Sequence, residues 1–194
     1  MTVTAVEFIT LDGVMQAPAR PDEDTRGGFS RGGWAVPYGD QVMAESVGRR
    51  MAEGAKGGGA LLFGRRTYTD FAAVWPPRAG DPIAEHLNST QKYVASRTLR
   101  DPLPWQNSVL LTDAEAQVAD LRREQDLTIL GSGALVRSLL RAGLVDQFLL
   151  TIHPLVLGEG RRLFPETGPY AALTLVDATS TTTGAIIATY RPAG

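Results

Sequence analysis

The chain has 194 residues, enough for one domain with a sizeable core, and we predict that residues 1–194 form a single domain. A formal net charge of −2 provides no broad positive field, so we predict neither nucleic acid nor a membrane surface as a partner. The absence of cysteine excludes disulfides and thiolate metal ligands, and two histidines do not supply a zinc site, so we predict no metal.

The amino terminus carries no targeting signal that we can identify. Residues 1–8 have neither the basic segment nor the apolar core of a signal peptide. No apolar stretch approaches the roughly 18 residues that indicate a membrane span. We therefore predict a cytoplasmic protein.

The first part of the chain predicts a strand, a long loop and a helix. Residues 3–9 alternate β-branched and aromatic side chains, as a strand does. Residues 10–38 are rich in Gly, Pro, Asp and Arg and lack periodicity, and a segment of that length is usually a lid, a binding loop or partly disordered. Its aromatic residues favour a binding loop over a solvated linker. Residues 40–55 have apolar side chains at helical spacing and end before three glycines.

The remainder alternates strands with helices. Strands are predicted at residues 60–63, 92–95, 108–111, 127–130 and 147–152. Helices are predicted from about residue 67 to the Trp-Pro-Pro at 75–77, and at 81–88, 113–123 and 134–142. Residues 172–177 and 184–190 flank a threonine-rich turn and predict an antiparallel hairpin. This order indicates an α/β fold, with a mostly parallel mixed sheet flanked by helices and a hairpin at the carboxyl end.

Three turns that directly follow predicted strands have the composition of phosphate-binding turns. They are Gly64-Arg65-Arg66-Thr67, Ser96-Arg97-Thr98 and Gly131-Ser132-Gly133-Ala134-Leu135. Open α/β sheets bind ligands beyond the carboxyl ends of their strands, so three such turns on neighbouring strands would converge on one ligand with several phosphates. A dinucleotide is the natural candidate.

Each turn offers a different kind of phosphate contact. Gly64 lets the backbone approach a ligand, Thr67 is a candidate helix N-cap, and arginine adds bidentate bonds, although a surface arginine pair at a helix start is the plainer interpretation. In Ser96-Arg97-Thr98 no carboxylate occupies the turn, which favours a 2′-phosphate over a free ribose hydroxyl and so NADPH over NADH. The Gly131 turn is not a Rossmann fingerprint, because Val136 replaces its third glycine.

With these motifs in order, the chain resembles the dihydrofolate-reductase-like superfamily. It is most similar to the reductase domain of the bifunctional riboflavin-biosynthesis deaminase/reductase and its stand-alone relatives. The segments that carry the resemblance are 8–14, 62–68, 94–98, 131–135 and 153–164. The deaminase half of the bifunctional enzyme needs a zinc site with cysteine, which this chain cannot have.

The resemblance implies an NADPH-dependent reductase that transfers hydride to a small planar heterocycle or a related carbonyl, imine or C=C compound. It assigns the cofactor phosphates to the three turns and places Thr10, Leu11, Asp12 and Gly13 beside the nicotinamide. It also implies a homodimer, to which residues 153–164 contribute.

Candidates for catalysis and substrate binding have structural alternatives. Asp12 and Asp40 are the catalytic candidates, but Asp12-Gly13 also suits a simple turn and Asp40 suits a helix N-cap. Trp34 and Thr151 are the substrate-binding candidates, although Trp34 could anchor the loop and Thr151 could be an ordinary strand residue. We interpret His153 as structural rather than catalytic. Because no proton donor is obvious, a non-catalytic protein that binds a small molecule or nucleotide on the same fold stays open as an alternative.

Overall fold

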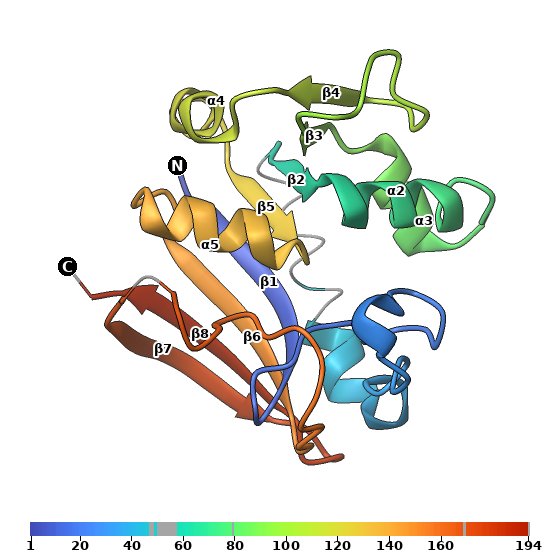
Figure 1. Ribbon diagram of the computed structural model, residues 1–194, viewed down its shortest axis with the longest axis vertical. Coiled ribbons are helices and arrows are strands. Elements are labelled where there is room, and N and C mark those ends of the chain that lie inside the picture. Colours follow the sequence, from blue (N-terminus) through green and yellow to red (C-terminus); the bar gives the residue numbers. More distant parts are fainter. Residues whose placement is uncertain (47–48, 50–57, 79, 169, 194) are drawn as a thin grey trace.

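The computed structural model describes residues 1–46, 49, 58–78, 80–168 and 170–193. Across these residues runs one eight-stranded sheet with the order β4-β3-β2-β5-β1-β6-β8-β7 (Figure 1). The strands are β1 (Val3–Thr10), β2 (Ala60–Gly64), β3 (Lys92–Ala95), β4 (Ser108–Leu111), β5 (Leu127–Leu130), β6 (Gln147–His153), β7 (Leu173–Ser180) and β8 (Ile186–Pro192).

The first six strands are parallel, and β8 and β7 join them as an antiparallel hairpin beside β6. The predicted mixed sheet with a carboxyl-terminal hairpin is thus confirmed. Parallel strands connected by helices must end at the same edge of the sheet. The carboxyl ends of β3, β2, β5 and β1 therefore lie next to one another.

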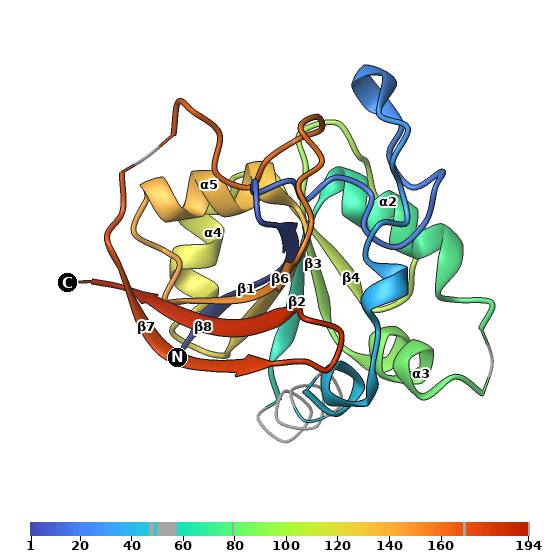
Figure 2. The ribbon, with the colours of Figure 1, turned by 90° about the horizontal axis from the view of Figure 1, so that it is seen from below.

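Helices cover both faces of the sheet. They are α2 (Arg65–Val74), α3 (Pro82–Ser89), α4 (Ala114–Leu121) and α5 (Gly133–Arg141). Helices α4 and α5 lie on one side, and α3 and the helical residues 41–46 lie on the other (Figure 2). The helix predicted at 40–55 is therefore present at 41–46, and most of its remainder lies outside the described residues.

Two apolar cores follow from the alternation of side chains along the strands. Odd residues of β1 such as Val3 and Ala5 are buried with Val136 and Leu139 of α5. On the other side, neighbouring residues of β2 pack in a second cluster with α3 and Trp105. Thr4, Val6 and Phe8, which alternate with the buried residues of β1, are each partly exposed although β1 lies between β5 and β6. That face of the central strand is incompletely covered.

Lys92 at the start of β3 is fully buried and holds the end of α3. Its Nζ donates hydrogen bonds to the carbonyl oxygens of Leu87 at 2.7 Å, Asn88 at 3.3 Å and Thr90 at 2.6 Å. The ammonium also lies 4.6 Å from the ring centroid of Trp105. The last carbonyls of a helix lack intrahelical donors, so this side chain supplies them.

The long segment after β1 is an ordered loop with two short 3₁₀ helices, η1 (Arg26–Gly28) and η2 (Val36–Tyr38). Phe29 and Trp34 are buried in a small cluster of their own with Val14. An ion pair between Arg20 and Asp70 at 2.5 Å ties the loop to α2. These contacts argue against a solvated linker, and the predicted role as a binding loop stays a prediction.

No helix among the described residues is both long and apolar enough to cross a membrane. Within the same residues, no group of three or more histidine, aspartate or glutamate side chains could hold a metal ion.

Candidate functional site

The sheet brings two of the three predicted turns into direct contact. Strands β2 and β5 are neighbours, and the Gly64 N–H donates to Ser132 Oγ at 2.8 Å. The Ser132 hydroxyl in turn donates to Thr67 Oγ1 at 2.9 Å. A Cβ on Gly131 would lie 3.3 Å from the Thr67 methyl group, and Gly131 has a positive φ of 57°. The two turns therefore form one continuous backbone surface that depends on glycine.

The helices that begin at this surface lack side-chain caps. The N-cap residues Gly64 of α2 and Ser132 of α5 make no side-chain capping bond, and neither helix has an acidic residue in its first turn. By contrast, Asp81 caps α3 and Asp113 caps α4. The first backbone N–H groups of α2 and α5 are therefore not capped by the N-cap side chain, and such groups favour an anion. The structure also corrects one prediction: Thr67 lies in the first turn of α2 and is not its N-cap.

Arginine side chains surround this edge. Arg65 and Arg66 at the start of α2 are exposed. The positive charge of Arg26, followed by desolvation and the charges of Arg65 and Arg161, lowers the pKa of Arg66. Arg26 comes from the long loop and Arg161 from the segment after β6, so four cations from three parts of the chain share one region. An anion between them would relieve their repulsion.

Arg26 and Arg161 were not predicted from the sequence. They border a cavity of about 220 Å³ together with Gln16, Phe29 and Gly160. Arg26 pairs with Asp24, yet its Nη1 is buried without a hydrogen-bond partner. Single arginines in a loop carry no recognisable pattern, so only the folded structure brings them to the site.

The turn after β3 presents one arginine from a fixed backbone. Ser96 is buried, and its Oγ accepts hydrogen bonds from the N–H groups of Thr98 at 3.1 Å and Leu99 at 3.0 Å. Arg97 and Thr98 are exposed. The serine hydroxyl is therefore engaged in closing the turn, which leaves the Arg97 side chain as the cationic group that this turn offers a ligand.

Asp12 anchors the segment after β6 to the end of β1. Its carboxylate accepts hydrogen bonds from Thr10 Oγ1 at 2.5 Å, Leu157 N at 3.2 Å and Gly158 N at 2.9 Å. Burial alone would raise the pKa of Asp12, but these bonds outweigh it and lower the pKa to about 2. The group is ionised at neutral pH, so its environment does not suit a proton donor. Its neighbour Leu11, predicted beside the nicotinamide, is 63% exposed.

Asp40 caps the helix that begins at residue 41. Its Oδ1 accepts from Met43 N at 2.8 Å, and its Oδ2 accepts from the N–H and the hydroxyl of Thr182, both at 2.6 Å. These contacts tie the helix to the turn between β7 and β8. The geometry favours the N-cap interpretation, and the predicted catalytic role gains no support from it.

The two substrate-binding candidates lie near His153, at the ends of β1 and β6. Trp34 is buried, and its indole N–H donates to Gln16 O at 2.7 Å. Thr151 is buried on β6 beside Phe8 of β1. Both residues lie at the incompletely covered face of β1, on the side of the sheet opposite α5. The structure thus places these two residues apart from the junction of the turns after β2 and β5.

Below the start of α5 lies a buried acid that sequence reasoning missed, although an acid inside a central strand is itself a signal. Glu7 of β1 is 3% exposed, and its Oε1 has no hydrogen-bond partner. Burial raises the pKa of Glu7 to about 8, and the nearby Arg137 guanidinium offsets only part of that shift. Arg137 itself donates to the carbonyl oxygens of Arg162 and Leu163.

Glu7→Gln is expected to remove a pH dependence of stability. Between pH 4.5, the ordinary pKa, and about 8, native Glu7 keeps a proton that the unfolded chain has lost. Its contribution is therefore complete below pH 4.5 and is lost as the pH rises through 8. Urea unfolding across this window measures the difference in free energy of unfolding between the variant and the wild type. We expect this difference to shift in favour of the variant by up to about 1.4 kcal/mol per pH unit. Glu124→Gln, at an exposed position, is the control. The prediction would be wrong if this control showed the same pH-dependent change in relative stability, or if the stability difference between Glu7→Gln and the wild type did not vary with pH.

Ser132→Ala is expected to lower the free energy of unfolding by about 1–3 kcal/mol, because the Gly64 N–H loses its acceptor. Chemical unfolding measures the loss. Ser138→Ala on the same helix is the control, since the Ser138 hydroxyl donates to Glu115 at an exposed position. Equal effects of the two substitutions would show that the hydrogen bond between the turns contributes little to the free energy of unfolding.

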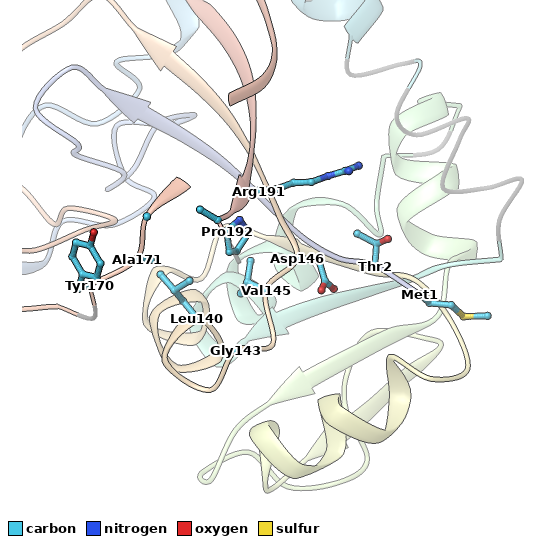
Figure 3. A pocket seen from close by; sticks show the side chains of 12 residues that line it. Met1, Thr2, Leu140, Gly143, Val145, Asp146, Tyr170, Ala171, Arg191 and Pro192 are labelled. Atoms are coloured by element: carbon cyan, nitrogen blue, oxygen red, sulfur yellow. The ribbon is translucent and has the colours of Figure 1, made fainter. Parts of the chain in front are cut away.

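A larger cavity than the one beside Arg26 lies elsewhere. A hollow of about 870 Å³ is lined by the start of β1, the end of α5 and the carboxyl terminus, including Thr2, Leu140, Tyr170 and Arg191 (Figure 3). None of the predicted site residues lines it. The strand ends are the better candidate for a binding site, because uncapped helix termini and clustered cations can bind an anion. The volume of a cavity by itself indicates no particular ligand.

The sheet order and its terminal hairpin define a dihydrofolate-reductase-like fold, and solved structures share it. A proposed riboflavin biosynthesis protein from Shewanella sp. PV-4 superposes with a TM-score of 0.72 at 20% identity, covering 100% of both chains. A pyrimidine reductase-like protein from Corynebacterium diphtheriae superposes with a TM-score of 0.66 at 14% identity, covering 100% of this chain and 92% of that one. RibD from Acinetobacter baumannii superposes with a TM-score of 0.64 at 15% identity, and the match covers 100% of this chain and 58% of the RibD chain.

The sequence itself places the chain among these proteins. The model of the RibD C-terminal domain matches residues 1–187, and the chain belongs to that family. An uncharacterized protein of Bacillus subtilis (strain 168), YyaP, is 30% identical over 137 residues, which cover 67% of this chain and 72% of YyaP. The predicted resemblance is confirmed, and membership indicates a reductase-type function.

Proposed function

We propose that the protein is an NADPH-dependent reductase that transfers hydride to a small planar heterocycle or a related carbonyl, imine or C=C compound. The observation that carries this proposal is the junction of the turns after β2 and β5, where two uncapped helix N-termini meet beside clustered arginines. A pyrophosphate suits such a surface, since it accepts from backbone N–H groups and carries negative charge.

The residues present fit the coenzyme. A side chain on Gly131 would crowd Thr67, and one on Gly133 would meet the sulfur of Met15, so glycine lets both turns lie close to their neighbours. The residues that would hold NADPH are Gly64, Arg65, Arg66, Thr67, Ser96, Arg97, Thr98, Gly131, Ser132, Gly133, Ala134 and Leu135, with Thr10, Leu11 and Gly13 at the nicotinamide end. When bound, NADPH supplies the hydride.

The protein's own contribution would be binding and orientation. Asp12 is ionised and Asp40 is engaged in a helix cap, so we propose that water supplies the proton. These same observations favour the second candidate function, a protein that binds a small molecule or nucleotide without turnover. The two functions share the site and differ only in chemistry.

The test is a fluorescence titration of the purified protein with NADPH and NADH, followed by absorbance at the reduced-nicotinamide band with a panel of planar heterocycles. We expect tighter binding of NADPH, and oxidation with at least one compound. Failure to bind either coenzyme would contradict the reductase function. Tight NADPH binding without oxidation across the panel would support the second.

We further propose a cytoplasmic homodimer. Residues 154–164 expose apolar side chains, with Val156 72% and Phe164 40% accessible, and exposed apolar residues of this kind suit a contact between copies. Light scattering of the wild type and of Val156→Asp is the test. A monomeric wild type would contradict the dimer.

A further inference from the structure

Glu7 and Arg137 form a pair of an acid and a cation that the proposed reaction does not use. Glu7 of β1 is 3% exposed, and its Oε1 has no hydrogen-bond partner. Helix α5 lies across the sheet over β1 (Figure 1) and brings the positive charge of Arg137 close to the Glu7 carboxyl group. A buried acceptor without a partner is unfavourable for the folded state, and an apolar side chain would avoid that cost. The position therefore suits a function beyond packing.

The Arg137 guanidinium makes its hydrogen bonds to the segment after β6. Its Nη1 donates to the carbonyl oxygens of Arg162 at 3.3 Å and of Leu163 at 3.1 Å. The same Nη1 would lie 3.1 Å from a Cβ on Gly133, the first residue of α5. One cation thus connects the first turn of α5 with residues 162 and 163.

Residues 161–163 in turn hold the chain that leaves β1. Backbone hydrogen bonds of 2.9 Å and a side-chain bond of 2.7 Å join them to residues 12–15. Met15 also contacts the start of α5, since a Cβ on Gly133 would meet its sulfur. The proposed function places the nicotinamide beside residues 10–13 and the pyrophosphate at the start of α5. Arg137 therefore helps to hold both parts of the proposed coenzyme site together.

The charge of Glu7 sets how strongly its carboxyl group competes for this cation. Burial raises the pKa of Glu7 to about 8, and the charge of Arg137 offsets only part of that shift. Glu7 is therefore neutral at pH 7 and becomes a buried carboxylate as the pH rises through 8. A buried carboxylate without a partner is strongly unfavourable, whereas a guanidinium would satisfy it with charge-assisted hydrogen bonds. Ionisation thus favours transfer of the Arg137 hydrogen bonds from the two carbonyls to Glu7.

The surroundings leave Arg137 as the group that responds. The strands on either side of β1 contribute apolar side chains to this face, among them Ile129 of β5 and Leu150 of β6. Within the described part of the chain, Arg137 is the one charged residue that acts on the Glu7 carboxyl group. Burial lowers the pKa of Arg137, Glu7 opposes this, and Arg141 and Arg161 add to it. An arginine nevertheless keeps its charge throughout the range in which Glu7 titrates.

Building on the proposed function, we propose that Glu7 and Arg137 form a pH-sensitive switch for coenzyme binding. With Glu7 neutral, Arg137 holds residues 162 and 163 against the start of α5, and the coenzyme surface is intact. When Glu7 releases its proton to solvent, Arg137 turns to the carboxylate and the two carbonyls lose their donor. Affinity for NADPH then falls, so the switch weakens binding as the pH rises and restores it as the pH falls.

The test follows the carbon resonances of ¹³C-labelled protein without coenzyme between about pH 6 and about pH 9. We expect the side-chain carboxyl resonance of Glu7 and the backbone carbonyl resonances of Arg162 and Leu163 to shift together, with a common midpoint near pH 8. The carbonyl of Val118, which accepts a backbone hydrogen bond from Arg122 at 3.0 Å, is the reference.

Glu7→Gln keeps this side chain neutral at every pH, so its carbonyl resonances and its NADPH affinity should not follow the transition. The wild type should lose about fivefold or more in NADPH affinity across the same range, measured by fluorescence. Glu124→Gln, at an exposed position, is the matched control and should behave as the wild type does. Arg137→Met removes the donor, so its carbonyl resonances of residues 162 and 163 should not vary with pH.

The inference would be overturned by a Glu7 resonance that titrates while those of residues 162 and 163 stay fixed, or by a Glu7 resonance that does not titrate in this range. An equal fall of NADPH affinity in the wild type and in Glu7→Gln would also overturn it. If Glu7→Gln does not fold, the resonances of the wild type and of Arg137→Met decide. A protein whose carbonyl resonances follow Glu7 but which does not bind NADPH would contradict the proposed function and leave the rearrangement of Arg137 standing.

Discussion

Arg97→Ala is expected to weaken NADPH binding by about 10- to 150-fold and to leave NADH binding nearly unchanged, so that the preference between the two largely disappears. A hydrogen bond to a charged group contributes roughly 1.5–3 kcal/mol, and about 1.4 kcal/mol corresponds to a tenfold change in affinity. Arg97 is exposed on a turn that Ser96 closes from within, and no carboxylate lies in that turn. Fluorescence titration with both coenzymes measures the two affinities.

The control for this prediction is Arg123→Ala, which removes an exposed arginine just beyond the end of α4 that pairs with Asp120 of that helix. It should change neither affinity. If Arg97→Ala retains the wild-type preference, the turn after β3 does not bind the 2′-phosphate. Arg65 and Arg66 would then be the next residues to replace.

Lys92→Met is expected to lower the free energy of unfolding by about 2–4 kcal/mol. Methionine fills a similar volume but leaves the buried Leu87 carbonyl and the partly buried Thr90 carbonyl without their donor, and it loses the contact of the cation with Trp105. For a chain of this size the corresponding fall in melting temperature is about 4–16 °C. Thermal and urea unfolding followed by circular dichroism measure both quantities.

Arg141→Met provides the comparison for Lys92, because Arg141 is exposed at the end of α5. Exposed substitutions of this kind usually change stability by less than about 0.5 kcal/mol. A loss at Lys92 no larger than that at Arg141 would mean that water replaces the ammonium at the end of α3.

Much of the fold could be predicted because its signals are local. The alternation of short apolar runs with helical spacing indicated a parallel sheet, and the threonine-rich turn between two short apolar runs indicated the final hairpin. Turn composition likewise singled out Gly64, Ser96 and Gly131, because glycine and serine at a strand end are visible in the sequence. The start of α2 was misplaced by two residues, since nothing local distinguishes Gly64 from Thr67 as the N-cap.

The candidate site was only partly predictable because its contacts join residues far apart in the chain. Asp40 is held by Thr182, and Asp12 by the N–H groups of residues 157 and 158. Arg26 and Arg161 approach Arg66 only after the loop has folded back over the strand ends. A pattern within one segment cannot indicate such partners.

The sequence by itself determined the class of fold, the family and the positions of three turns, since periodicity, glycine placement and short motifs are properties of neighbouring residues. Tertiary structure alone decided which polar groups are satisfied and which are not: the uncapped starts of α2 and α5, the protonated Glu7 and the unpaired Nε2 of His153. Burial and hydrogen bonding depend on what the whole chain packs around each group, and these properties set the chemistry of the site.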